Sequence, residues 1–450
     1  MTQQLHELSA DHEAHIASAI GKFFRRIIPM LALMLIVNQI DRANIGFVKA
    51  ELQTDAGISA AAFGLGAGLF FIGYALFEVP SNMMLKKLGA RVWLTRIMIT
   101  WGMVVVLTGF VSTPLHFYLL RFLLGVAEAG FFPGVLFYFR QWVPNAWRGR
   151  ATAMVLSATA SAFLFSGPLT GAILMMHDVG GLAGWKWVMF LEGGGSIAIG
   201  LLAAMVLVSK PEGAKWLSDA EKQALAQQLA LEETARDGRA VTQGRWGLIT
   251  DRRLISYCLI FFTMTMTGYT LVFWLPQIIQ RIQGFNSFET GLLTAIPWLF
   301  AIVALFLLGK ATDRYRDKLD RGLGIAMLIA ACGTFMATLG TPWSGFVAMI
   351  VACVGSKVSA AFFWPMPQSE LPASIAAPGI AMINSIGNLG GFFAPTVFGY
   401  LEMHTGSTTG GLYALTSVSV VTGLWLLLRS KPVPPALGHK ERHDVRQSSH

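Results

Sequence analysis

The stretch AFGLGAGLFFIGYALFEVPSNMM (62–84), followed at once by LKKLGARVWLTR (85–96), decides the fold class of this chain. Residues 62–84 contain one charged side chain, Glu78. A helix of this length spans a hydrocarbon core of about 30 Å, and the basic segment after it is typical of a cytoplasmic loop. The alternation of long apolar segments with basic connections continues along the chain and predicts a helical membrane protein.

Composition agrees with this prediction and excludes a soluble globule. The 450 residues are 54% hydrophobic and 13% charged, whereas average proteins carry roughly 25% charged residues. Cys258, Cys332 and Cys353 lie in apolar stretches without a CxxC or histidine-rich neighbourhood. We therefore expect no disulfide framework and no metal site.

Twelve candidate spans group as six plus six and predict an all-α polytopic membrane protein. The spans are 27–47, 62–84, 93–111, 117–138, 151–175 and 186–208, then 254–280, 288–309, 323–340, 344–366, 378–400 and 410–428. The predicted organisation is a cytoplasmic tail (1–26), an N-terminal half (27–208), a cytoplasmic linker (209–253), a C-terminal half (254–428) and a cytoplasmic tail (429–450).

The basic residues set the predicted orientation. With the N-terminus inside, 28 of the 34 lysines and arginines fall in cytoplasmic segments, as the positive-inside rule requires. The net charge of +9 is therefore a topology signal rather than a nucleic-acid footprint. We expect both termini in the cytoplasm and no nucleic-acid partner. The opposite loops hold Lys49, Lys186 and Arg281, and the spans hold Arg42, Arg121 and Lys357.

An internal repeat supports the division into halves, because NMMLKKLGAR (82–91) and GKATDRYRDK (309–318) both follow the second span of a half. Two such halves are a transporter plan that places the substrate near the bilayer midplane. With this repeat, the chain resembles the major facilitator superfamily over nearly its whole length. Within it the chain is similar to the anion:cation symporter family, whose permeases carry tartrate, phthalate, hydroxyphenylacetate and sugar acids. The motifs that carry the resemblance are DRANIGF (41–47), FEVPSNMMLKKLGAR (77–91), LRFLLGVAEAGFFPG (120–134), GWKWVMFLEG (184–193), GKATDR (309–314) and NSIGNLGGFFAP (384–395).

The resemblance implies a bacterial inner-membrane protein that works by alternating access, binds a small organic anion and needs no cofactor beyond coupling protons. We expect a monomer in the lipid bilayer. One departure concerns the first gate motif, where Lys86 precedes Lys87 and the acid usual in the superfamily is missing. The residues expected to form the gates are Glu78, Lys87, Arg91, Asp313 and Arg314.

Charges inside the spans are the main functional signal, because each costs about 2.5–3.5 kcal/mol at a helix centre unless it has a partner or a task. Arg121 and Glu128 lie two turns apart on one helical face. Adjacent Asp41 and Arg42 point about 100° apart and need different neighbours. The resemblance implies that Arg42 and Arg121 bind substrate and that Asp41 and Glu128 carry protons. The alternative is that these residues form structural ion pairs. The full set of six is Asp41, Arg42, Glu78, Arg121, Glu128 and Lys357.

Lys357 is specific to this chain, because the common motifs of the superfamily require no lysine there. Lys357, Ala361 and Trp364 follow i, i+4, i+7 spacing and therefore lie on one helical face. We expect this face, with its cation and its aromatic ring, to point toward the other half. A lysine snorkelling to the interface is the alternative. The remaining substrate-binding candidates are Tyr74, by resemblance, together with Trp274, Asn384 and Asn388.

With Asp41 and Glu128 protonated, the three bases outnumber Glu78 by two charges, which favours a dicarboxylate. Aromatic side chains that could form a wall around a planar, phthalate-like ring favour aromatic cargo, although packing explains most such stripes. These residues are Tyr74, Tyr269, Trp274, Phe363 and Trp364. The sequence therefore predicts a proton-coupled importer of an organic dicarboxylate. A hydroxylated acid (tartrate or a sugar acid) and an aromatic monocarboxylate are alternatives, and so are an anion channel and a sensor that does not transport. No HExxH, GxSxG or GxxxxGK[ST] motif supports an enzyme.

Overall fold

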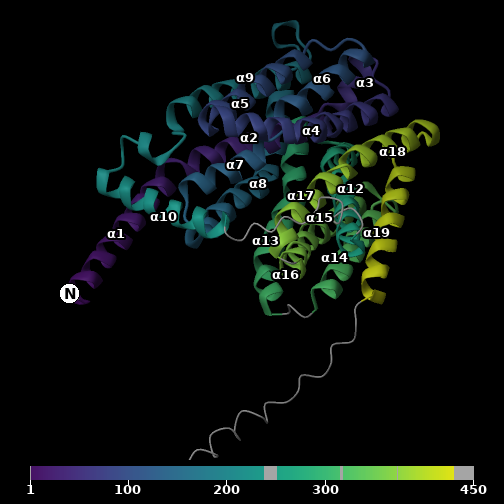
Figure 1. The fold of residues 1–450 in the computed structure, drawn as a ribbon. Coiled ribbons are helices and arrows are strands. Elements are labelled where there is room, and N and C mark those ends of the chain that lie inside the picture. The colour runs from purple at the N-terminus through teal and green to yellow at the C-terminus, as the bar shows by residue number, and fades with distance from the viewer. Residues whose placement is uncertain (1, 238–250, 315–317, 372, 430–450) are drawn as a thin grey trace, which may run out of the picture.

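The computed structural model describes residues 2–237, 251–314, 318–371 and 373–429. Helices of the two sequence halves form two bundles, purple to teal and green to yellow in Figure 1. Ten of the described helical segments are long and apolar enough to cross a membrane. The all-helical prediction is confirmed, and strands are absent from the described residues.

The helices of the N-terminal half follow the predicted spans closely. Two further helices lie outside the spans: α1 (Thr2–Arg26) in the predicted N-terminal tail, and α3 (Lys49–Asp55) between the first two spans. The others are α2 (Ile28–Phe47), α4 (Ala60–Leu88), α5 (Ala90–Thr108), α6 (Pro114–Glu128), α7 (Phe131–Trp142), α8 (Asn145–Leu174) and α9 (Gly184–Val206).

The linker contains α10 (Asp219–Asp237), which packs beside α1 (Figure 1). In the C-terminal half, the predicted span 378–400 is divided between α17 and α18. The helices of this half are α12 (Arg252–Gln280), α13 (Ser287–Arg314), α14 (Leu319–Met336), α15 (Pro342–Phe363), α16 (Pro365–Glu370), α17 (Ala373–Asn388), α18 (Gly390–Thr405) and α19 (Thr409–Arg429).

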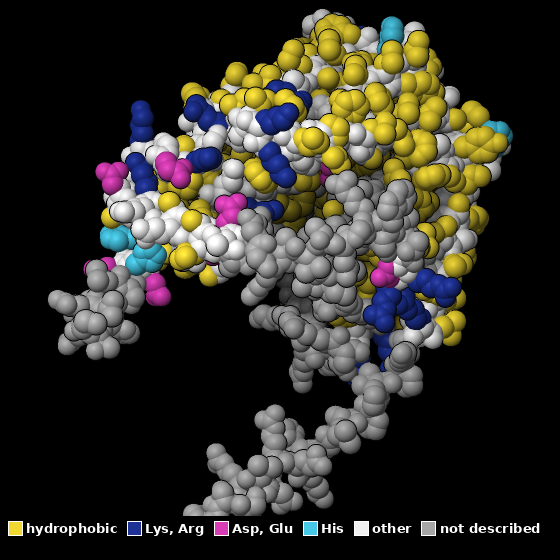
Figure 2. All heavy atoms as spheres, in the orientation of Figure 1, with side chains coloured by type: hydrophobic (Ala, Val, Ile, Leu, Met, Phe, Trp, Pro, Cys, Tyr) yellow, Lys and Arg dark blue, Asp and Glu magenta, His cyan; other side chains and the backbone are white. Residues whose placement is uncertain are grey.

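Figure 2 shows hydrophobic side chains over much of the outer surface of the bundles. The dark blue lysines and arginines gather toward the end where α1 and α10 lie and where α19 ends. We call this end of the molecule the α10 end and the opposite one the α3 end.

Close backbone contacts join the two halves at the α3 end. A Cβ atom on Gly64 of α4 would lie 2.1 Å from the Pro395 carbonyl oxygen of α18, and one on Gly291 of α13 would lie 2.1 Å from the Gly167 oxygen of α8. Gly46 of α2 faces the Phe273 backbone of α12 in the same way. Small residues allow membrane helices this degree of approach. The halves are therefore closed against each other at the α3 end.

The fourth predicted span is broken at Ala129 and Gly130, which separate α6 from α7. Gly130 has φ +82°, a left-handed conformation that glycine adopts without strain. Ser81 of α4 donates a hydrogen bond of 2.5 Å to the Ala129 carbonyl, which satisfies a backbone group freed by the break. The break makes Glu128 the last residue of α6, inside the bundle rather than at its surface.

We expect Gly130→Ala to destabilise the protein, because the left-handed backbone alone costs about 1–2 kcal/mol for an L-residue. The new Cβ would also lie 2.5 Å from Ser81 Oγ. Thermal unfolding in detergent should show a lower midpoint. Gly195→Ala is the matched control, since its Cβ meets no atom within 4 Å and alanine favours the helix. An equal midpoint in both variants would contradict this account of the break.

Candidate functional site: a buried charge cluster between the halves

Arg42 of α2 and Glu128 of α6 form a partly buried ion pair on the side of the N-terminal half that meets the C-terminal half. Glu128 Oε1 accepts hydrogen bonds from Arg42 Nε at 2.5 Å and from Asn38 Nδ2 at 2.7 Å, and Arg42 Nη2 also contacts Oε1. Arg42 Nη1 donates at 3.0 Å to the Tyr269 hydroxyl of α12. The pair on α2 and α6 is therefore connected directly to the C-terminal half.

Arg121 lies beside this pair without an acid of its own. It is 3% exposed, and its Nε has no hydrogen-bond partner. Its guanidinium lies 5.3 Å from the centroid of the Phe70 ring, and that of Arg42 lies 5.2 Å from the same ring. No ion pair to Arg121 occurs within the described residues. The Glu128 carboxylate is thus paired with Arg42, and Arg121 is left without a paired anion among the described residues.

Asp41 points away from Arg42, as the adjacent positions on a helix predicted. Its Oδ2 accepts hydrogen bonds from Trp101 Nε1 at 2.5 Å and from Ser196 Oγ at 2.6 Å. These partners come from α5 and α9. The expectation that Asp41 and Arg42 need separate neighbours is confirmed.

The set of six charges predicted inside the spans is incomplete. Glu192 of α9 is 6% exposed and accepts hydrogen bonds from Asn44 Nδ2 at 2.7 Å and from Thr170 Oγ1 at 2.8 Å. The signal was present in the sequence, because Glu192 lies well inside the predicted span 186–208. The sequence analysis also missed two neighbours of the cluster, Asn38 and Phe70.

Lys357 faces the other half, as the spacing along α15 predicted. Its Nζ lies 4.9 Å from the ring centroid of Phe163 on α8 and 5.2 Å from that of Trp298 on α13. The two rings stack on each other with centroids 4.7 Å apart. Cation–π contact offsets part of the cost of burying the ammonium group. No carboxylate is paired with Lys357 in the described parts of the chain.

The other substrate-binding candidates lie in different places. The Tyr74 ring lies 5.3 Å from the Arg42 guanidinium, so Tyr74 belongs to the cluster. Trp364 packs against Phe261 and Phe363 at the end of α15. Asn384 and Asn388 are half-buried on α17.

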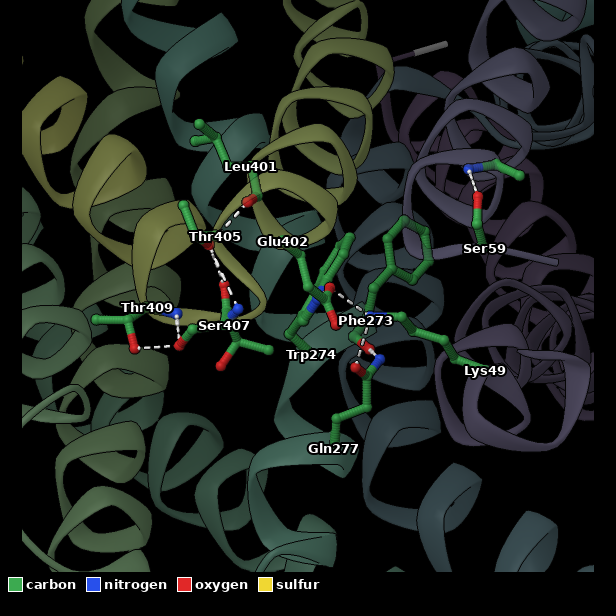
Figure 3. A network of polar contacts seen from close by, with 12 residues as sticks. Lys49, Ser59, Phe273, Trp274, Gln277, Leu401, Glu402, Thr405, Ser407 and Thr409 are labelled. Carbon is green, nitrogen blue, oxygen red and sulfur yellow. Dashed lines mark hydrogen bonds and ion pairs between the residues drawn. The ribbon is translucent and has the colours of Figure 1, made fainter. Parts of the chain in front are cut away.

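Trp274 is not brought to the cluster. It lies in a second polar network, at the α3 end (Figure 3). There Lys49 Nζ forms an ion pair of 2.6 Å with Glu402 Oε2 and donates to Gln277 Oε1 at 2.8 Å. Trp274 Nε1 donates to the same Glu402 oxygen at 3.2 Å. Lys49 is 1% exposed, so the pair is a buried connection between α3 and the C-terminal half.

Among the gate candidates, Glu78 of α4 lies beside Ser385 of α17 in the other half. Arg91 Nε donates to the Ala204 carbonyl of α9 at 2.7 Å, and Lys87 is exposed. Asp313 and Arg314 lie in the last turn of α13, and their side chains fall outside the described residues.

The fold agrees with comparisons with known proteins. The profile of the Major Facilitator Superfamily matches residues 31–395. The chain belongs to this superfamily. It is a multi-pass membrane transporter and not an enzyme.

Several curated relatives are similar over most of their length. Two proteins of Agrobacterium vitis, named provisionally as tartrate transporters, are 39% and 40% identical over 94% and 95% of this chain and 93% and 97% of their own. A quinolone resistance transporter of Acinetobacter baumannii is 40% identical over 89% of this chain and 92% of its own.

Solved structures share the fold at low sequence identity. The E. coli xylose transporter XylE in a partially occluded inward-open conformation has a TM-score of 0.71 and 16% identity, covering 93% of this chain and 99% of XylE. A bacterial homologue of the human lysosomal transporter Spinster has a TM-score of 0.68 and 18% identity, covering 90% and 95%.

We expect Glu402→Gln to open the α3 end, because it leaves the buried Lys49 ammonium without a counter-charge, a loss of about 3–5 kcal/mol for buried pairs. Spin labels at the exposed positions Thr54 and Gln283 should show a second, longer distance by pulsed electron resonance. The double variant Lys49→Met/Glu402→Met should restore the short distance, and Lys186→Met serves as the unaffected control. An unchanged distribution in Glu402→Gln would show that the pair does not hold this end closed.

Proposed function

We propose that this protein imports a small hydroxylated dicarboxylate, such as tartrate, together with protons. The observation that carries the proposal is the buried Arg121, whose guanidinium lies next to the Arg42–Glu128 pair without an acid of its own. An uncompensated guanidinium is expensive in a membrane unless an anion arrives to pair with it. Carboxylates match its planar donors in a bidentate geometry.

Coupling follows from the competition for Arg42. While Glu128 is ionised, Arg42 is held by its Oε1. A proton that binds the Glu128 carboxylate removes the negative charge and releases Arg42, which then joins Arg121 in attracting the substrate. Loss of the same proton restores the ion pair and expels the anion. Proton and substrate thus bind together, which is the requirement for symport.

Charge and shape favour a dicarboxylate with polar groups over a planar aromatic acid. Within the described residues, Lys357 is a second cation without a paired acid, after Arg121, and it lies at the boundary between the halves, which favours a second carboxylate. Two of the aromatic residues considered for a ring-binding wall are fully buried in other packing, namely Trp274 and Phe363. The names of the Agrobacterium relatives point the same way.

The α10 end is the cytoplasmic end in this proposal, because most of the basic residues lie in segments on that side. The structure, closed at the α3 end, then corresponds to an inward-facing state in the bacterial inner membrane. Glu78 and Ser385, which connect the halves nearer the α10 end, would separate or approach as the transporter changes state.

The decisive experiment is uptake of labelled tartrate into proteoliposomes with an imposed inward proton gradient. We expect saturable accumulation in the wild type. Glu128→Gln should abolish accumulation but keep tartrate counterflow, because the neutral side chain mimics the protonated state. The exposed Glu233→Gln is the control. Accumulation by Glu128→Gln equal to that of the wild type would remove Glu128 from coupling.

Other functions give different results in the same vesicles. Passive, non-saturating conductance would indicate an anion channel, and tartrate binding without flux would indicate a sensor. Because one relative is a quinolone resistance transporter, a labelled quinolone should also be tested. Export of the quinolone with no tartrate uptake would overturn the proposal.

We expect Lys357→Met to weaken dicarboxylates more than monocarboxylates, by roughly tenfold or more if one charge-assisted contact of about 1.5–3 kcal/mol is lost. Competition of tartrate and lactate against labelled tartrate measures the difference. Lys357→Arg, which keeps the charge, should retain most of the preference. Equal losses for both acids would mean that Lys357 does not contact a second carboxylate.

A further inference from the structure

Two buried carboxyl groups, Asp41 of α2 and Glu192 of α9, lie outside the Arg42–Glu128 pair and are connected through hydrogen bonds between their helices. Asp41 accepts a hydrogen bond from Ser196, which lies one helical turn after Glu192 on α9. Glu192 accepts one from Asn44, which lies three residues after Asp41 on α2. Each acid is thus bound by the helix that carries the other. The two carboxyls are close enough to interact electrostatically.

The groups around this pair are neutral. Asp41 is bound by the Trp101 indole and the Ser196 hydroxyl, and Glu192 by the Asn44 amide and the Thr170 hydroxyl. All four partners are 2% exposed or less. Both carboxyl groups are therefore surrounded by neutral hydrogen-bond donors that are shielded from solvent.

Cations on the helices that pack against the pair are engaged elsewhere. Arg42, the nearest cation on α2, is bound to Glu128. Glu128 is itself an acid that interacts electrostatically with Asp41. Those on α1 and at the start of α12 lie at the α10 end, namely Lys22, Arg25, Arg26, Arg252 and Arg253. Those on α5, α8 and α9 contact other groups, namely Arg91 with Ala204, Arg96 with Trp93, Arg148 with Glu232, Arg150 with Phe24 and Lys186 with Trp185.

One carboxylate oxygen of the pair has no hydrogen-bond partner among the residues that the structure describes. Asp41 Oδ1 is buried and accepts no hydrogen bond, and the whole residue is 3% exposed. An ionised carboxylate with a bare oxygen in such a place is far more costly than a neutral carboxyl group. Two ionised carboxylates without a cation would also repel each other, as in sites where two acids share one proton.

We propose that Asp41 and Glu192 form a two-carboxyl proton site in which they share at least one proton, and that Glu192 is a further coupling residue of the transport cycle. The proton binds at the free Oδ1 of Asp41 without breaking any hydrogen bond in the structure. The coupling role rests on the proposed proton-driven import, whereas the shared proton does not. Because Asp41 and Arg42 are adjacent on α2, movement of that helix affects this site and the Arg42–Glu128 pair together.

Infrared titration of the purified protein in lipid vesicles tests the shared proton without any substrate. The band of protonated carboxyl groups should titrate in two steps that both change in Asp41→Asn. Glu192→Gln, which keeps the shape and hydrogen-bonding capacity, should remove one step and move the other to lower pH by about one unit, since a neighbouring acid no longer opposes ionisation. An unchanged titration in Glu192→Gln would overturn the proposal.

Thr170→Val is a second variant of nearly the same shape that keeps both carboxyl groups. It removes a hydrogen bond that favours ionised Glu192, so a titration step should move to higher pH, opposite to the effect of Glu192→Gln. A purely structural role for Glu192 predicts no such opposed shifts. Sodium chloride should leave the titration unchanged, and displacement of the protons by Na⁺ would overturn the assignment in favour of a cation site.

Tartrate uptake as a function of pH tests the coupling role. In Glu192→Gln, the midpoint of the pH profile of proton-driven tartrate uptake should move to lower pH, and tartrate counterflow should be retained. If the wild type accumulates tartrate with protons but the pH profile of Glu192→Gln equals that of the wild type, Glu192 is not a coupling residue. If the wild type shows no proton-coupled uptake, the proposed function fails, and the infrared titration still decides whether the proton is shared.

Discussion

The cost of placing charge inside a membrane is the constraint on which the rest of this structure depends. Each ionised side chain in a span must find a partner, because no water is available to solvate it. Arg42 forms an ion pair with Glu128, to which Asn38 also donates a hydrogen bond, and Lys49 forms an ion pair with Glu402. Arg121 and Lys357 lie over aromatic rings, and neither is paired with an acid within the described residues. This incomplete pairing is the basis of the proposed anion site.

The pairing also explains how the two halves are connected. Arg42 reaches Tyr269, Lys49 reaches Glu402, and Lys357 lies over Phe163, so each of these cations has a contact in the opposite half. Glycines bring the backbones together at the α3 end. Because both halves contribute to the surroundings of each cation, a change in charge at one of them alters the contact between the halves. In the proposed transport cycle, these shared contacts link the binding of an anion or a proton to the change of conformation.

Much of the fold was predictable from sequence, because a bilayer imposes a length and a composition on every span. The helix α12 (Arg252–Gln280) differs from the predicted span 254–280 by two residues. The break between α6 and α7 was not predicted, since Gly130 reads as one more small residue in an apolar run. Only its positive φ and the approach of Ser81 show that the helix stops there.

The sequence by itself determined which charges lie inside the spans, apart from the omission of Glu192. It also determined that the adjacent Asp41 and Arg42 diverge, because helical periodicity fixes the directions of side chains along one helix. It did not determine the partners. The interpretation of Arg121 and Glu128 as one face was compatible with a pair between them, yet the carboxylate is bound by Arg42. Likewise, Lys49 was assigned to an outer loop, and only the packing of α3 against α12 and α18 buries it on Glu402. Which of two nearby cations holds an acid depends on distances between helices, and only the tertiary structure sets those distances.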